Sequence, residues 1–429
     1  MLLTRPAPST FAPALRAVNQ TRPPTALAPL NVCVLAACPF PANHGTPGSI
    51  REMSEAVAAL GHEVHIVTYH IGEAIPLDGP ILHRIPRLTG ESAVVVGPTT
   101  RRPLYDLLMV LTALRVIREH RPQLIHAHGY EAGLAAWLCR LATGLPVLYS
   151  GHNTMIDELP SYKFIRPAWL AWKLARLLDV TVPRMANRCL PHSTNMQHFF
   201  SSVGLRARTD PVAPGAIDID QFAGGDGSEV RRRYHLGQRP IVLYAGVQDE
   251  FQRLDLLLEA MTQVAARQPE AKLLFVVTIP CAKHLERMRR AVNDLGLDER
   301  VIFTEPQPLA AIPDFLAACD VAVLSRPQAP GFPMKLLNYM AARRACVLFA
   351  SSSSTGLIHR VNAYLAEPDT AAALARGILE VLQDKSLRRR LANNGYRLVR
   401  ERHDRRIVAA QLCASYYRTL EAAGHRRSN

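Results

Sequence analysis

The chain has 429 residues, of which 48% are hydrophobic and 20% charged, and its formal net charge is +14. This length predicts two domains of roughly 100–200 residues each. The composition is that of a soluble globular protein. No apolar run reaches the ~18–20 residues of a membrane span, and no helix-turn-helix, RNA-binding or zinc pattern accompanies the charge. We therefore expect anionic lipid headgroups or an anionic substrate such as a nucleotide diphosphate as partners, and no nucleic acid.

Eight cysteines are scattered along the chain without a C-x-x-C pair. This spacing disfavours metal and redox sites and is typical of buried thiols in a reducing cytoplasm. Residues 1–29 lack the apolar stretch of a secretory signal, so we expect a flexible tail, or a start codon placed too early. We expect a cytoplasmic protein and leave open its peripheral attachment to the inner membrane face.

Strands alternate with helices in the first half of the chain. The apolar run at Asn31–Ala37 predicts a buried parallel strand, which a helix over Ser49–Leu60 and a strand over Glu63–Thr68 follow. Further elements are expected at 124–127 (strand), 132–142 (helix) and 147–150 (strand). This order is that of a doubly wound domain, which we place at residues 30–210.

The second half restarts with a buried strand at Pro240–Ala245. Helices at 254–267, 284–295, 309–318 and 333–342 then alternate with strands at 272–278, 301–304, 321–324 and 346–350. We place this domain at residues 211–400, and expect 401–429 to form a helix that packs back toward the first domain. The predicted fold class is α/β, with two doubly wound Rossmann-like domains facing across a cleft, where ligands of such sheets bind.

A long loop at 38–49 follows the first strand. Gly48 allows the backbone to approach a ligand closely, and Ser49 is placed to cap the next helix, whose N-terminus attracts phosphate. We assign Gly48 and Ser49 to the binding site of a phosphorylated substrate, here called the donor. We assign His44 to the binding site of a second substrate, here called the acceptor. The alternative is an ordinary strand–helix connection with a helix cap.

Two histidines, His126 and His128, end the third predicted strand, and alternate residues of a strand share one face. His128 lies nearer the strand tip and is our candidate catalytic residue; two satisfied polar residues are the alternative. A metal site would need a third ligand, which the nearby sequence does not supply.

A polar cluster follows the next strand. His152, Glu158 and Tyr162 are candidates for acceptor binding through hydrogen bonds to sugar hydroxyls. A capped loop that leads into a helix at 169–178 explains the same residues.

In the second half, Gly246 ends the strand and a polar loop follows it. We assign Gly246, Asp249 and Gln252 to donor binding. Arg253 is either a cation for a diphosphate or a surface charge.

Lys335 lies in the first turn of the helix at 333–342, where a cation opposes the helix dipole. This placement predicts a bound anion at Lys335; the alternative is an exposed lysine that reaches water.

These residues carry a resemblance to the retaining glycosyltransferases of the GT-B fold, glycosyltransferase family 4. About 390 residues follow that family's order of landmarks, which in this chain read GHEVHIVT, LIHAH, APGAIDIDQF, YAG, LDLLLEAM, ACDVAVL and GFPMKLLNYMAA. The resemblance implies sugar transfer from a nucleotide diphosphate sugar to a hydroxyl acceptor with retention, without a metal or other cofactor. It adds Arg326, Gly331, Phe332, Leu336 and Asn338 to the donor site.

The chain departs from the family's pattern at its charged donor contacts. Pro330 and Asn338 stand where the family has the two glutamates of its E-x7-E motif. Val247 and Gln252 stand where it has a cationic pair for the diphosphate, and Arg343 replaces a helix-ending glycine. Arg253, Arg326 and Lys335 are the nearest substitutes.

These departures leave alternatives to a transferase. One is a degenerate GT-B protein that binds a nucleotide sugar or scaffolds a glycan pathway without catalysis. The other alternative is a GT-B epimerase or phosphorylase, although a phosphorylase needs a pyridoxal-phosphate lysine or a longer chain.

The sequence leaves open whether the acceptor is a lipid, a glycan or a small molecule. The segment Arg101–His120 predicts a helix with basic ends and an apolar middle. Either it packs in the core of the first domain or it docks on a membrane, as in family members that act on lipids.

Overall fold

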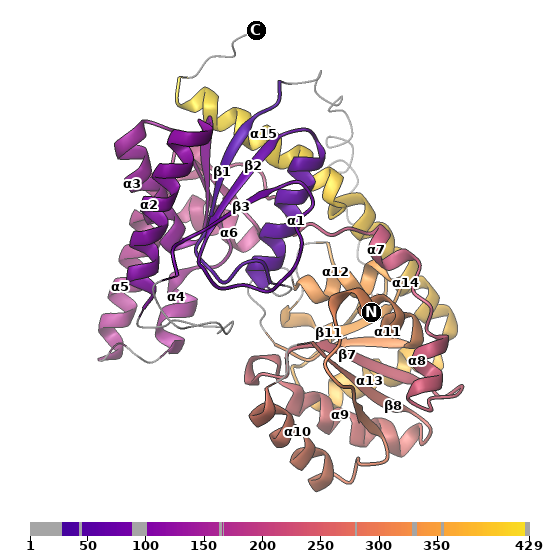
Figure 1. The fold of residues 1–429 in the computed structure, drawn as a ribbon. Helices are drawn as coiled ribbons and strands as arrows, with labels where there is room; N and C mark the ends of the chain where they lie inside the picture. Colours follow the sequence, from indigo (N-terminus) through magenta and orange to yellow (C-terminus); the bar gives the residue numbers. More distant parts are fainter. Residues whose placement is uncertain are drawn as a thin grey trace, which may run out of the picture.

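The computed structural model describes residues 28–42, 45–87, 101–162, 165, 167–278, 281–327, 333–352 and 356–424. Two lobes lie side by side, and each contains one six-stranded parallel sheet between helices (Figure 1). This confirms the predicted pair of doubly wound domains.

The first sheet has the strand order β3-β2-β1-β4-β5-β6. Its strands are β1 (Asn31–Ala36), β2 (Glu63–Thr68), β3 (Ile81–Arg84), β4 (Leu124–His128), β5 (Val147–Gly151) and β6 (Arg188–Pro191). The helices of this lobe are α1 (Gly45–Ala59), α2 (Arg102–His120), α3 (Tyr130–Thr143), α4 (Met155–Glu158), α5 (Ala168–Thr181) and α6 (Thr194–Ser202). Apolar side chains cover both faces of the sheet, as a parallel sheet requires.

The second sheet has the order β12-β11-β10-β7-β8-β9, which repeats the topology of the first. Its strands are β7 (Ile241–Gly246), β8 (Lys272–Val277), β9 (Val301–Phe303), β10 (Val321–Leu324), β11 (Ala345–Phe349) and β12 (Tyr364–Ala366). Its helices are α7 (Asp220–Ala223), α8 (Ser228–Arg233), α9 (Leu254–Arg267), α10 (Ala282–Asp294), α11 (Ile312–Ala318), α12 (Met334–Ala341), α13 (Ala371–Gln383) and α14 (Lys385–Arg402). In both sheets the strand order reverses beside the first strand, where such folds bind ligands.

The first helix begins earlier than predicted. α1 starts at Gly45, so Ser49 is a buried residue inside the helix, and its prediction as the helix cap was wrong. Pro47 in the first turn loses no intrahelical hydrogen bond, because the first N–H groups of a helix have no partner there.

The chain crosses twice between the lobes, and the two crossings pair with each other. The amide of Ile217 donates to the carbonyl of His403 (2.9 Å), and the amide of Arg405 donates to the carbonyl of Ile217 (3.0 Å). Arg405 also forms an ion pair with Asp218 (3.0 Å). Two paired strands of backbone therefore connect the lobes.

The last helix, α15 (Arg405–Ala422), leaves the second lobe and packs on α1 of the first (Figure 1). Leu412 and Tyr416 of α15 are buried in the same apolar cluster as Met53 of α1. Arg418 of α15 also donates to Asp210, a carboxylate fully buried beside β6. The C-terminal helix therefore belongs to the core of the first lobe.

We expect Leu412→Ala to lower the free energy of unfolding of the first lobe by about 2–5 kcal/mol, because truncation of a buried leucine leaves a cavity. Urea denaturation followed by circular dichroism measures this change. Ile407→Ala, at an exposed position of the same helix, is the matched control, with an expected change of about 0.5 kcal/mol or less. Equal midpoints for the two variants would contradict the packing of α15.

Candidate active site between the lobes

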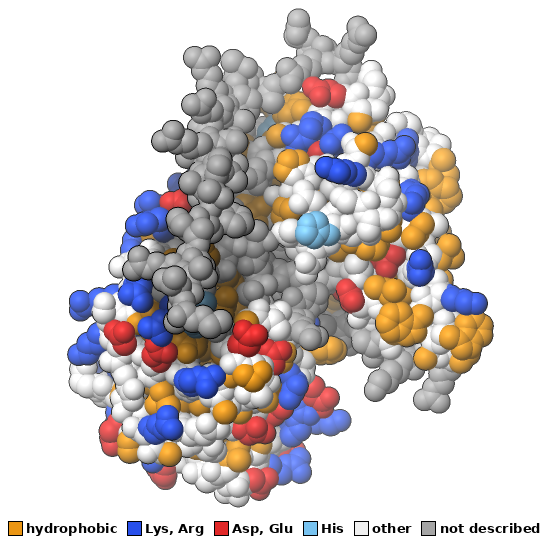
Figure 2. All heavy atoms as spheres, turned by 180° about the vertical axis from the view of Figure 1, so that it is seen from behind, with side chains coloured by type: hydrophobic (Ala, Val, Ile, Leu, Met, Phe, Trp, Pro, Cys, Tyr) orange, Lys and Arg blue, Asp and Glu red, His pale blue; other side chains and the backbone are white. Residues whose placement is uncertain are grey.

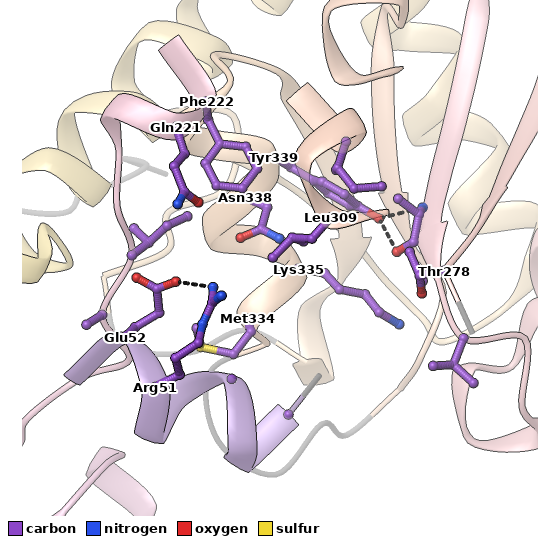
Figure 3. Close-up of a pocket in the computed structure, with 18 residues that line it drawn as sticks. Arg51, Glu52, Gln221, Phe222, Thr278, Leu309, Met334, Lys335, Asn338 and Tyr339 are labelled. Atoms are coloured by element: carbon purple, nitrogen blue, oxygen red, sulfur yellow. Dashed lines mark hydrogen bonds and ion pairs between the residues drawn. The ribbon is translucent and has the colours of Figure 1, made fainter. Parts of the chain in front are cut away.

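A pocket lies between the two lobes, and we call it the interdomain pocket (Figure 3). The first lobe contributes the start of α1, and the second contributes the end of β7 and the first turns of α12. The lining residues are Gly45, Gly48, Arg51, Glu52, Ala216, Ile217, Gln221, Phe222, Ala245, Gly246, Val247, Thr278, Leu309, Ile312, Met334, Lys335, Asn338 and Tyr339. A ligand bound here would contact both lobes at once.

Lys335 is the cation that lines this pocket on the side of the second lobe. Its Nζ donates to the hydroxyl of Tyr244 (2.6 Å) and to Oε1 of Gln252 (2.8 Å). Gly246 has a φ of +143°, and a Cβ there would lie 2.4 Å from Cε of Lys335. Glycine at this strand end therefore makes room for the lysine to pass over the backbone.

Burial lowers the pKa of Lys335 to about 7, although the nearby carboxylate of Asp249 acts in the opposite direction. Arg326 lies close enough to lower the pKa of Lys335 further. Among the described residues, no carboxylate lies within ion-pair distance of Nζ. An anion that enters the pocket would therefore meet an ammonium group that no carboxylate neutralises.

The α12 helix is held against β7 by Tyr339. The hydroxyl of Tyr339 accepts from the amide of Ala245 (2.9 Å) and donates to its carbonyl (3.2 Å). Asn338, the preceding residue, lines the pocket. Tyr339 thereby positions both Lys335 and Asn338 on the strand end.

Arg51 and Glu52 of α1 line the opposite side of the pocket, and the sequence analysis missed them. Their side chains form an ion pair (2.9 Å), and burial raises the pKa of Glu52 (Figure 3). Nε of Arg51 and Oε2 of Glu52 are buried without a partner among the described residues. Once α1 begins at Gly45, both residues follow its first turn, a position that a helix start at Ser49 concealed.

The structure brings part of the predicted donor site together. Gly48, Gly246, Lys335 and Asn338 line the pocket, and Gln252 contacts Lys335. Asp249 accepts from the amide of Gln252 and so shapes the adjacent loop, while Arg326 lies over the ring of Phe251.

Other predicted donor residues lie elsewhere. Arg253 is paired with Asp255 (2.8 Å), which favours the surface-charge alternative. The side chains of Ser49 and Leu336 are buried in the lobes and do not line the pocket. Gly331 and Phe332 lie outside the described residues.

His128 lies in a second group of polar residues, the strand-end histidine cluster of His128, His152 and His192. Nδ1 of His128 is 3.1 Å from Nε2 of His152, whose ring stacks on that of His192 at 4.3 Å. Burial lowers the pKa of all three rings, that of His192 to about 4, so the cluster is uncharged at neutral pH. None of the three lines the interdomain pocket.

This cluster lies at the carboxyl edge of the first sheet. His128 ends β4, and His152 and His192 directly follow β5 and β6. The same edge carries the chain from β1 into the pocket-lining start of α1. His128 and the pocket-lining start of α1 therefore lie along the same edge of the first sheet.

His126 has a different role from His128. Its Nε2 is 2.7 Å from Oγ of Ser150 and its Nδ1 is 3.0 Å from the hydroxyl of Tyr416 on α15. Both ring nitrogens are therefore satisfied inside the core, as in one of the two alternatives given for this pair of histidines.

The predicted acceptor residues are only partly brought together. His152 joins His128, whereas Glu158 accepts from Nδ2 of Asn153 (2.7 Å) at the end of α4. His44 and the side chain of Tyr162 lie outside the described residues.

The strand-end histidine cluster contains enough ligands for a metal ion, which the local sequence did not indicate. The candidate ligand atoms lie within 4.8 Å of one another. Nδ1 of His192 is bound to the carbonyl of Ala213 (2.7 Å), and its Nε2 is buried without a described partner. A free Nε2 could equally accept a hydrogen bond from a substrate hydroxyl.

Two protein-family models match the chain, one in each lobe. The model "Glycosyltransferase Family 4" matches residues 45–221, and the model "Glycosyl transferases group 1" matches residues 239–384. The matched segments contain all residues that line the interdomain pocket except Phe222.

Curated relatives have similar names. The D-inositol 3-phosphate glycosyltransferase of Rhodococcus jostii is 28% identical over 287 residues, which cover 62% of this chain and 61% of that protein. The GDP-mannose-dependent α-(1-6)-phosphatidylinositol monomannoside mannosyltransferase of Mycolicibacterium smegmatis is 31% identical over 163 residues, 37% of this chain and 42% of that protein. The chain thus matches about three fifths of the first relative's length and less of the second's.

Solved structures share the fold. The sucrose-phosphate synthase of Thermosynechococcus elongatus superimposes with a TM-score of 0.77 at 20% identity, covering 92% of this chain and all of that one. Anabaena HepE, in complex with UDP and glucose, has a TM-score of 0.72 at 16% identity, covering 91% of this chain and all of that one. At these identities the similarity establishes the arrangement of the two lobes.

We expect the Lys335 ammonium to titrate near pH 7 in the ligand-free protein, well below the 10.5 of an exposed lysine. The chain has only six lysines, so reductive ¹³C-methylation followed by NMR resolves them individually. Lys335→Arg assigns the signal, because the resonance of residue 335 is then lost from the spectrum. A Lys335 signal that titrates above pH 10 would contradict the burial of this side chain.

Proposed function

The chain belongs to the GT-B glycosyltransferases of family 4, and from this premise we propose that it transfers a sugar from a nucleotide diphosphate sugar to a hydroxyl acceptor with retention. The nucleotide would bind to the second lobe and the acceptor to the first, with the reacting sugar between them. Closure of the lobes would exclude water and limit hydrolysis of the donor.

The observation that carries this proposal is the partly buried ammonium of Lys335, which lines the pocket between the lobes from the side of the second lobe. When the bond between sugar and diphosphate breaks, negative charge grows on the leaving phosphate. Lys335 would neutralise this charge, and the N-termini of α1 and α12 would add their partial positive charges. No divalent cation is needed in this scheme.

The pairing of Lys335 with Gln252 also accounts for a departure from the family's pattern. Gln252 stands where the family resemblance places a cation for the diphosphate. Because Nζ of Lys335 is 2.8 Å from Oε1 of Gln252, a lysine on α12 brings its charge to the same place. This supports a rebuilt phosphate site over a degenerate protein that has lost its donor contacts.

His128 is the proposed contact to the transferred sugar or the acceptor. Its environment keeps the ring neutral, so it can donate one hydrogen bond and accept another. Asn338, in place of a glutamate, would hydrogen-bond a ribose hydroxyl without adding a charge that repels the diphosphate.

The test is to incubate the protein with UDP- and GDP-sugars and measure nucleotide release, with calorimetry for binding. We expect Lys335→Ala to weaken UDP or GDP binding about 10–100-fold, the loss of one charge-assisted contact. Lys385→Ala is the control, because it removes the same charge at an exposed site. If the wild type binds the nucleotide sugar without turnover, the non-catalytic alternative is favoured. If the wild type shows no binding and no turnover, the proposal is rejected.

The pH dependence of binding follows from the pKa of Lys335. A bound anion raises this pKa above its free value of about 7, so the complex holds more protons than the free protein above pH 7. Nucleotide affinity should therefore fall as the pH rises from 7 toward 9, by up to about tenfold per unit. In Lys335→Met this slope should disappear.

The acceptor is proposed to be lipid-linked and presented at an anionic membrane surface. No helix in the described part of the chain is long and apolar enough to cross a bilayer. However, α5 exposes Trp169, Trp172 and Leu177 to solvent together with Lys173 and Arg176, and orange side chains gather on this lobe in Figure 2. Tryptophans and leucines beside cations are typical of helices that lie in a membrane interface.

The helix first considered for membrane docking is α2. One of its faces packs in the core and another is exposed, so it has features of both alternatives, a core helix and a docking helix. Its residues Tyr105, Met109 and Val116 are buried in the core, whereas Leu107 and Leu111 are more than half exposed. It therefore serves as a core helix with an apolar outer edge, and α5 is the better candidate for the docking surface.

We expect the protein to sediment with phosphatidylglycerol vesicles and not with phosphatidylcholine vesicles, and to dissociate at high salt. The double variant Trp169→Ala/Trp172→Ala should bind at least fivefold more weakly, because it removes the largest apolar side chains of α5. Ile358→Ala, an exposed apolar residue of the second lobe, should bind like the wild type. Unchanged binding of the double variant would exclude α5 as the docking surface.

A further inference from the structure

Three histidines outside the cleft converge from separate elements, and we call them the α2 histidine cluster. His65 lies on β2, His83 lies on β3, and His120 ends α2. The ring centroids of His65 and His120 are 4.1 Å apart, and each is 5.3 Å from that of His83. One candidate ligand atom from each ring lies within 4.8 Å of the other two.

The orientation of His65 is that of a metal ligand with a supporting carboxylate. Oε1 of Glu63 is 2.9 Å from Nε2 of His65, and since a carboxylate only accepts, it holds the proton on Nε2. The lone pair of His65 is then on Nδ1, which lies 3.0 Å from Nε2 of His83. Metal-binding histidines regularly donate their other N–H to a carboxylate in this way.

The spacing suits tetrahedral coordination. Ligand nitrogens at the Zn–N distance of ~2.0–2.1 Å lie about 3.3 Å apart, close to the separation between His65 and His83. The candidate ligand nitrogen of His120 lies within 4.8 Å of the other two, so the His120 ring must move closer to reach the same point. Its side chain is only partly buried, and no described residue forms a hydrogen bond with its ring.

The surroundings hold the cluster in place. Nδ2 of Asn31 donates to the carbonyl of His120 (2.9 Å) and to Oε2 of Glu63 (3.3 Å), so one amide positions both the end of α2 and the carboxylate. Glu63 and Glu119 provide negative charge near the rings, against one positive charge from Arg115. His65 is fully buried, while the partial exposure of the other two rings leaves a path for an ion and for a water as fourth ligand.

A hydrogen-bonded stack of neutral rings explains less of this arrangement. A His65–His83 hydrogen bond accounts for one contact of 3.0 Å. Ring stacking accounts for the third ring at 4.1 Å from His65, but not for the carboxylate that turns the Nδ1 lone pair toward the centre. Three imidazoles without a thiolate match Zn²⁺ and related divalent transition ions, and exclude Mg²⁺ and Ca²⁺.

We propose that His65, His83 and His120 bind one Zn²⁺ ion, with Glu63 as the positioning residue for His65. The ion would tie the C-terminal end of α2 to β2 and β3. Glu63 and Asn31 begin their strands, so the site lies toward the amino edge of the sheet, away from the interdomain pocket. The ion therefore stabilises the first lobe, and the proposal does not depend on the proposed glycosyltransferase reaction.

The experiment uses the full chain without a histidine tag, stripped with EDTA and titrated with ZnCl₂ by calorimetry. We expect one Zn²⁺ bound at micromolar Kd or below, a higher Tm with Zn²⁺, and no effect of Mg²⁺. His83→Gln and His120→Gln should each weaken this binding at least tenfold, and Glu63→Gln about tenfold, the usual effect of losing a ligand or its supporting group.

Two controls separate this site from other histidines. His235→Gln, at an exposed position, should bind Zn²⁺ like the wild type. His192→Gln disrupts the strand-end histidine cluster, the other group of histidines that could hold a metal ion in the described part of the chain. This variant should still bind Zn²⁺ at the α2 histidine cluster, whereas His83→Gln should lose that binding. Absence of Zn²⁺ binding below 100 µM in the wild type, or equal affinity in wild type, His83→Gln and His120→Gln, would overturn the proposal.

Discussion

The pairing of the two interlobe crossings constrains the whole molecule. Ile217 exchanges backbone hydrogen bonds with His403 and Arg405, so the chain that enters the second lobe is bound to the chain that leaves it. Gly215 lies so close to Met334 that a Cβ would be 2.8 Å from its sulfur, which places this crossing directly beside α12. Ala216 and Ile217 of this crossing line the pocket together with the wall formed by α1 and the wall formed by α12.

The pocket that results is asymmetric in its charge. On the side of the second lobe, a partly buried lysine has two neutral hydrogen-bond acceptors and no carboxylate partner among the described residues. On the side of the first lobe, Arg51 and Glu52 neutralise each other. A buried ammonium is costly unless a counterion arrives, so the second lobe is the side prepared for an anion. This asymmetry is consistent with a division of labour between a donor lobe and an acceptor lobe.

Histidines are concentrated at two places in the first lobe, and the two clusters differ in their support. The strand-end histidine cluster has a carbonyl behind His192 and an unsatisfied nitrogen in front, which suits a polar substrate group. The α2 histidine cluster has a carboxylate behind His65 and does not line the interdomain pocket. The two clusters therefore differ in the group that holds the second ring nitrogen, which decides the ligand that the first nitrogen suits.

The sequence by itself determined the two α/β halves, most strand and helix positions, and the residues at strand ends such as His128 and Gly246. These follow from local runs of apolar residues and their period, which do not depend on distant contacts. It placed the start of α1 four residues too late, because a serine before a helix is a common cap and Gly45 is a common helix breaker. That error concealed Arg51 and Glu52.

Only the tertiary structure decided which of these residues act together. Lys335 and Gln252 are far apart in sequence and meet because β7 and β10 are neighbours in the sheet. His152 and His192 join His128 because β5 and β6 follow β4 in spatial order, and His65, His83 and His120 meet because α2 packs across β2 and β3. Strand order and helix packing are global solutions to burying both faces of a sheet, and no local pattern of residues specifies them.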